Sequence, residues 1–164
     1  MNSDFYVMLF LWIALPFILW KVTPRNRLRE ALATLLFFQM LTWLFSIFLT
    51  YFGLYDPPFR LFKHATKINW TMEYIVFPFF SVLFQLTFPK YAHFLKRLLH
   101  YLFWVVMILL AMVLLGKISN IVNNNLETLI RSFFNFIIEL WLCRQYILWF
   151  MNHPDYERLE HNEG

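Results

Sequence analysis

The sequence is short of charge: only 15% of its 164 residues are charged, whereas 60% are hydrophobic and 22% aromatic. A soluble domain carries roughly a quarter charged residues, so this chain lacks the charge needed to cover a surface that faces water. Its apolar residues come in long blocks instead of a 3.6-residue stripe, and helices that are apolar all round belong in lipid. The composition therefore predicts a single domain embedded in a membrane.

Cysteine and glycine are scarce as well. Cys143 is the only cysteine, which excludes an internal disulfide and a multi-cysteine metal motif. The three glycines, at positions 53, 116 and 164, cannot form a Gly-x-x-x-Gly contact between helices. A phosphate-binding glycine loop, a Gly-x-Ser-x-Gly elbow, a His-Glu-x-x-His motif and the paired acidic motif of lipid enzymes are all missing. The sequence therefore predicts no enzymatic activity and implies no metal or cofactor.

Long apolar blocks are what the chain does have. They predict an all-α transmembrane bundle of about five helices, at about residues 5–22, 31–52, 70–88, 98–116 and 132–151, followed by a polar tail at 153–164. About 20 apolar residues are enough to cross the hydrocarbon core. The first block has no basic residue before it and no small-residue cleavage site after it, so we expect an uncleaved helix.

Basic residues fall unequally in alternate loops. One side of the predicted membrane domain receives Lys21, Arg25, Arg27, Arg29, Lys90, Lys96, Arg97 and Arg158, and the other receives Arg60, Lys63, Lys67, Lys117 and Arg131. Loops rich in Lys and Arg stay in the cytoplasm, so the N-terminus is predicted to lie outside and the tail in the cytoplasm. This loop pattern is typical of membrane orientation, and no nucleic-acid partner is expected.

Polar side chains inside the predicted helices are candidate functional residues, because hydrocarbon makes them costly. Arg131, Asn135 and Glu139 recur every four residues and share one helix face. A carboxyl group as deep as Glu139 has to be neutral or paired, which leaves a proton or cation site and a hydrogen bond to a neighbouring helix as alternatives. Arg144 lies about 140° around the helix from Glu139, so we expect it to snorkel to the cytoplasmic end without pairing with Glu139.

Two other predicted helices also carry polar residues at helical spacing. The second contains Gln39, Thr42, Ser46 and Thr50, and the third contains Ser81 and Gln85. These side chains could face helix five across a polar cavity, or they could form ordinary hydrogen bonds between helices. The candidate intramembrane polar site therefore comprises Gln39, Gln85, Asn135, Glu139 and Arg144.

The segment from Arg60 to Pro89 resembles an uncharacterised family of small multi-pass membrane proteins of Bacillota (Bacillus and Clostridium relatives). The shared features are an arginine before the third helix, an aromatic and acidic helix start, a proline within the helix and a Phe-Pro exit, here Arg60, Trp70, Glu73, Pro78 and Phe88-Pro89. The resemblance extends over most of the chain. It implies a bacterial cell membrane and carries no catalytic residues across.

Two functions follow as expectations. The first is a non-enzymatic accessory protein that acts through transmembrane helix contacts with a partner membrane protein or a second copy of itself, within the lipid bilayer. The second is a small transporter or channel component with its polar site around Glu139. A cavity that joins Gln39, Gln85 and Glu139 would favour transport, whereas polar residues that are each bonded to a neighbouring helix would favour the first function.

Overall fold

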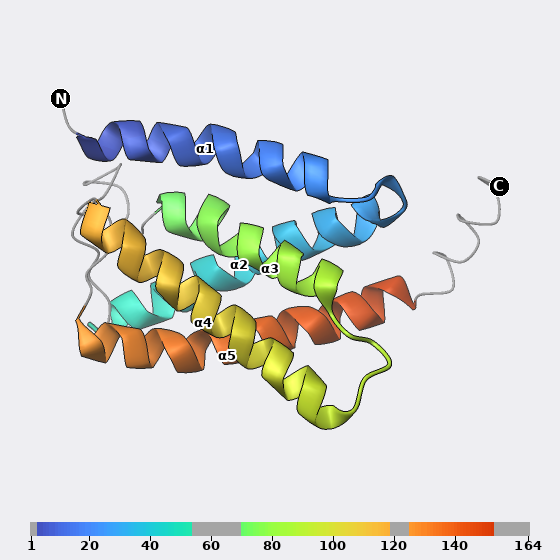
Figure 1. Ribbon diagram of the computed structural model, residues 1–164. Helices are drawn as coiled ribbons and strands as arrows, with labels where there is room; N and C mark the ends of the chain where they lie inside the picture. The colour runs from blue at the N-terminus through green and yellow to red at the C-terminus, as the bar shows by residue number, and fades with distance from the viewer. Residues whose placement is uncertain (1–2, 54–69, 119–124, 153–164) are drawn as a thin grey trace.

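The computed structural model describes residues 3–53, 70–118 and 125–152, and over these ranges the chain is helical without any strand (Figure 1). The five α-helices in these ranges are α1 (Ser3–Val22), α2 (Leu28–Tyr51), α3 (Phe77–Thr87), α4 (Phe94–Ile118) and α5 (Leu126–Met151). A 3-10 turn, η1 (Arg25–Arg27), precedes α2, and a π-helical turn, η2 (Met72–Val76), leads into α3. The predicted all-α architecture with about five helices is confirmed. The predicted tail at 153–164 lies outside the described residues.

Within the part of the chain that the structure describes, three segments are long and apolar enough to cross a membrane: Phe5–Val22, Arg25–Tyr51 and Phe94–Ile118. They correspond to the first, second and fourth predicted spans. The third apolar segment, Met72–Thr87, is shorter. The crossing of the membrane by this segment and by α5 stays a prediction.

Three helices begin earlier than the sequence pattern indicated. The predicted first loop extended to Glu30, but α2 begins at Leu28, so Glu30 lies in its first turn and is only 4% exposed. Likewise α4 begins at Phe94 and α5 at Leu126, several residues before the predicted 98 and 132. The cause is physical: charged residues next to an apolar block end the hydropathy signal, but they do not end the helical backbone, which only Pro or Gly breaks strongly.

The helices pack around a core to which α2, η2, α3, α4 and α5 all contribute. Phe38 from α2, Ile108 from α4 and Leu140 from α5 are completely buried there. Within this bundle, α2 contacts α3 and α5, and α4 contacts α3 and α5. In Figure 1, α1 lies along one edge of the bundle, and its main contacts are with η2 and α3. The bundle of α2 to α5 therefore positions every candidate residue.

Candidate functional site

The five candidate residues do not meet in one cavity. Gln39 contacts η2, Gln85 contacts the first turn of α2, Asn135 and Glu139 line a small cavity near the middle of α5, and Arg144 lines a groove between α4 and α5. Each place has its own chemistry.

Gln39 binds a carbonyl group that a proline leaves without a helical partner. In an α-helix the carbonyl of Tyr74 would accept the N–H of residue 78, but Pro78 has none. The Nε2 atom of Gln39 donates a hydrogen bond to the Tyr74 carbonyl at 2.7 Å. The hydroxyl of Thr42, one turn further along α2, lies 3.2 Å from the carbonyl of Glu73 in the same π-helical turn. Two residues of the predicted polar stripe therefore hold α2 against the irregular start of α3.

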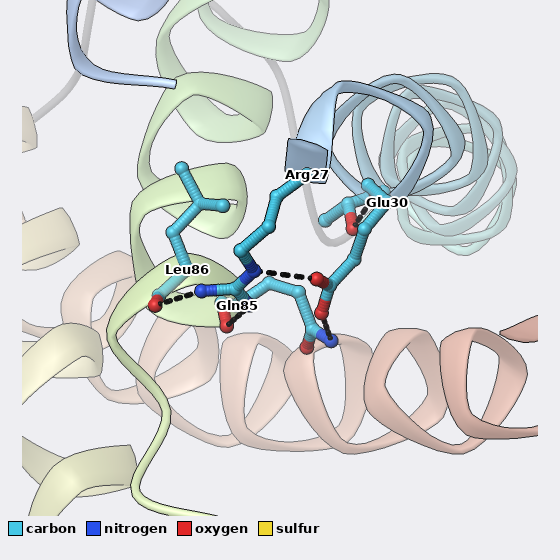
Figure 2. A network of polar contacts seen from close by, with 5 residues as sticks. Arg27, Glu30, Gln85 and Leu86 are labelled. Carbon is cyan, nitrogen blue, oxygen red and sulfur yellow. Dashed lines mark hydrogen bonds and ion pairs between the residues drawn. The ribbon is translucent and has the colours of Figure 1, made fainter. Parts of the chain in front are cut away.

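Gln85 belongs to a network that joins the start of α2 to the end of α3 (Figure 2). Its Nε2 atom donates to Oε1 of Glu30 at 2.8 Å, and the Nε atom of Arg27 donates to Oε2 of the same carboxylate at 2.8 Å. Arg27 also donates to the backbone carbonyls of Leu86 (2.6 Å) and Gln85 (3.3 Å). The last carbonyls of a helix have no partner within it, so Arg27 caps the C-terminal end of α3.

Arg27 and Glu30 were not among the predicted site residues. The sequence did carry a signal, because the two residues are three positions apart and such a pair shares a helix face. The hydropathy pattern assigned both residues to a loop, where helical spacing has no meaning, so this signal was not recognised. Only the structure shows that residues almost sixty positions away, Gln85 and Leu86, complete the network.

Glu139 lines a cavity of about 50 Å³ together with Asn135 and Arg131, as their shared helix face predicted. The space has room for a few water molecules, each of which needs roughly 10–15 Å³. Asn135 donates its Nδ2 hydrogen to Oε1 of Glu139 at 2.7 Å. The second oxygen of Glu139, Oε2, is buried and has no hydrogen-bond partner among the described residues. It is an acceptor, or a donor when protonated, on a residue that lines the cavity.

Hydroxyl groups line this cavity, and a second carboxyl group lies near Glu139. The lining includes Thr42 and Ser46 from α2 and Ser132 from α5. Glu73 is 1% exposed and lies close enough to Glu139 for their charges to interact. In the sequence, Glu73 stands at a predicted helix start, and that position indicates no link to Glu139.

Arg144 is 6% exposed, so the protein surrounds most of its side chain, and its snorkelling to the cytoplasmic end stays a prediction. Its guanidinium carbon lies 4.3 Å from the centre of the Phe88 ring, a cation–π contact. Among the described residues it has no hydrogen bond or ion pair, and in particular none with Glu139, which agrees with the helical geometry. The nearby carboxylate of Glu30 is already occupied by Arg27 and Gln85. Arg144 is therefore a nearly buried cation without a counterion.

Metal ligation finds no geometric support in residues 3–53, 70–118 and 125–152, where no group of three or more His, Cys, Asp or Glu side chains could hold an ion. Comparison with known proteins gives no family model, no curated protein and no solved structure that matches the chain. The function therefore has to be inferred from the chemistry of the buried polar residues.

Proposed function

We propose that this chain is a non-enzymatic multi-pass membrane protein that acts through transmembrane helix contacts with a partner membrane protein or with a second copy of itself. One observation carries the proposal. The polar side chains of Gln39, Thr42 and Gln85 each form a hydrogen bond with a neighbouring segment of the same bundle. Such bonds stabilise a scaffold. They leave Gln39 and Gln85 without a shared cavity through which a solute could pass.

The outer surface supports the same proposal. Helix α1 has its main contacts with η2 and α3, and most of its large apolar side chains point away from the bundle, among them Phe10 (68% exposed) and Ile13 (66% exposed). Lipid tails are as apolar as these side chains, so apolarity alone does not drive association. Bulky rings of irregular shape supply the van der Waals packing that does.

Photo-crosslinking from α1 in cells tests the proposal. A photoreactive amino acid at Phe10 is expected to give a discrete protein adduct, or a dimer of the chain, because the side chain faces outward. The matched control is Phe38, which is completely buried in the core and should crosslink only within the chain. A chain that stays monomeric in mild detergent and gives no discrete adduct from Phe10 would contradict the proposal.

A second function, a small transporter or channel component, is favoured by the cavity at Glu139. The free Oε2 atom and the nearby Glu73 carboxyl would let the cavity bind and release a proton or a small cation. In proteoliposomes, Glu139→Gln should then abolish a proton- or cation-dependent flux, whereas Lys117→Gln at the end of α4 should leave it intact. A flux that survives Glu139→Gln would remove Glu139 from the mechanism.

The membrane placement belongs to the proposal as well. We place five crossings in a bacterial cell membrane, with the N-terminus outside and the tail in the cytoplasm, on the distribution of Lys and Arg. In a Cys143→Ser background, a membrane-impermeant maleimide added to intact cells should label Lys117→Cys, on the predicted outer side, and should not label Arg25→Cys, on the predicted cytoplasmic side. Labelling of Arg25→Cys from outside would reverse the orientation.

A further inference from the structure

A groove of about 670 Å³ lies between the first half of α4 and the second half of α5. Figure 1 shows α4 crossing α5, and the two helices diverge on the side where α4 begins. From Phe94 to Leu102 the groove follows α4 for about 12 Å, and from Leu148 to Ile137 it follows α5 for about 16 Å, at the rise of 1.5 Å per residue. It is thus an elongated space that runs from one end of the bundle toward the middle.

The groove has a basic end and an apolar end. Lys90, Arg97 and Arg144 line it, and among the residues that the structure describes no acidic side chain does. Lys90 and Arg97 lie before or within the first turn of α4, near the predicted cytoplasmic surface. The deeper part toward the middle of both helices is lined by Leu102, Ile137 and other apolar side chains. This gradient from positive to apolar matches an amphiphile that lies along the bilayer normal.

Arg144 is a charged residue that lines this groove and is nevertheless buried. Its side chain is more than nine-tenths buried, it rests on the Phe88 ring, and it has no hydrogen bond or ion pair with the described residues. A guanidinium group presents five N–H donors that suit phosphate geometry, and leaving them unused in a nearly dry place is unfavourable. Arg27 and Arg97 add like charges close enough to interact with Arg144, and Glu30, which Arg27 and Gln85 already bind, adds one negative charge. The local charge is therefore positive overall and attracts an anion.

We propose that this groove binds a membrane lipid with an anionic phosphate head group, whose phosphate contacts Arg144 and whose acyl chain lies against Leu102 and Ile137. The bilayer is the source of the ligand, because the apolar end of the groove would gain nothing from a free anion. A zwitterionic head group would bring its own positive charge against Arg97 and Lys90, so the groove discriminates against it. The inference goes beyond the proposed helix contacts, but it rests on the proposed membrane placement, because the bilayer supplies the ligand.

The test uses the full chain in detergent, titrated with dioctanoyl phosphatidylglycerol or dioctanoyl phosphatidylcholine, with bound lipids counted by native mass spectrometry. We expect one saturable phosphatidylglycerol site. Arg144→Gln should weaken it by about tenfold or more, since a hydrogen bond to a charged group contributes that much. Arg25→Gln is the matched control, because Arg25 is exposed at the same end of the bundle and outside the groove, and it should change the affinity by less than about twofold.

A second variant keeps every charge. Leu102→Trp fills the deep end of the groove with a larger side chain, so it should also weaken phosphatidylglycerol binding by about tenfold. If Arg144→Gln fails to fold, Leu102→Trp decides the question. Equal binding of the two lipids, or unchanged binding in Leu102→Trp, would overturn the proposal. Displacement of the lipid by inorganic phosphate at similar concentrations would also overturn it, since it would show a site for soluble anions.

Discussion

Gln39 supplies to the carbonyl of Tyr74 the hydrogen bond that Pro78 cannot supply. The contact joins the middle of α2 to the π-helical turn before α3, at 2.7 Å between Nε2 and the carbonyl oxygen. The proline and the glutamine lie 39 positions apart in the sequence. The proline lacks the N–H that would bond the Tyr74 carbonyl in an α-helix, and the glutamine side chain bonds that carbonyl instead. Because the break in the helix and its repair come from different helices, the pair fixes the register of α2 against α3.

Replacing Gln39 by Leu should lower the free energy of unfolding by about 1–2 kcal/mol, because it leaves the part-buried Tyr74 carbonyl without a partner. The measurement is reversible unfolding in mixed detergent micelles. The control is the same substitution in a Pro78→Ala background, where residue 78 again offers an N–H. There the loss should be smaller, and equal losses in the two backgrounds would show that Gln39 acts independently of the proline.

Substitutions in the network of Arg27, Glu30 and Gln85 should be strongly non-additive. Glu30→Gln removes the carboxylate that accepts from both Arg27 and Gln85, and we expect a loss of about 2 kcal/mol, below the range of a fully buried pair because Arg27 is 26% exposed. Adding Arg27→Gln to Glu30→Gln should cost less than the sum of the two single losses. Additive losses, measured in the same unfolding assay, would contradict the network.

Glu139→Gln should change stability by less than about 1 kcal/mol. The amide oxygen of Gln can still accept the hydrogen from Asn135, and the second oxygen of Glu139 has no partner to lose among the described residues. Glu139→Leu should cost about 1–2 kcal/mol more, because it leaves the Asn135 amide without its acceptor. A large loss of stability in Glu139→Gln would mean that a charged carboxylate is needed for the fold.

Cys143 should resist N-ethylmaleimide in the folded protein. It is the only cysteine in the sequence, is 2% exposed, and packs against α2 with its sulfur 4.0 Å from the carbonyl of Thr34. Labelling monitored by mass spectrometry should become complete only on unfolding. Cys143→Ser combined with Leu126→Cys, at a residue that is 73% exposed, provides the rapidly labelled control. Fast labelling of Cys143 in the native protein would place it outside the core.

The sequence predicted the helices well because apolar blocks of membrane length are a local property. It also predicted that Arg131, Asn135 and Glu139 share a face, since helical spacing alone determines this. It did not predict which helix each polar residue meets. The sequence left two alternatives for Gln85, a cavity shared with helix five and a hydrogen bond to a neighbouring helix, and in the structure it bonds Glu30 of α2. This partner depends on how far α2 extends before its apolar block begins.

The groove at Arg144 could not be found from the sequence at all. Its basic end combines residues from the loop before α4, from α4 and from α5, and only the crossing of α4 over α5 brings them together. Snorkelling of Arg144 to the cytoplasmic end stays a prediction. Nothing in the sequence indicates that Phe88 lies under the guanidinium group.

The position of Arg27 also bears on the order in which the protein is made. Its acceptors in α3, the carbonyls of Gln85 and Leu86, are synthesised almost sixty residues later, so α2 enters the membrane before this cap exists. During that interval Glu30, three residues away, is the only partner of the network within reach, and the two side chains together carry no net charge. Arg27 therefore has a residue of opposite charge three positions away before α3 is synthesised. Once α3 is in place, its last carbonyl groups accept the remaining hydrogen bonds of the arginine.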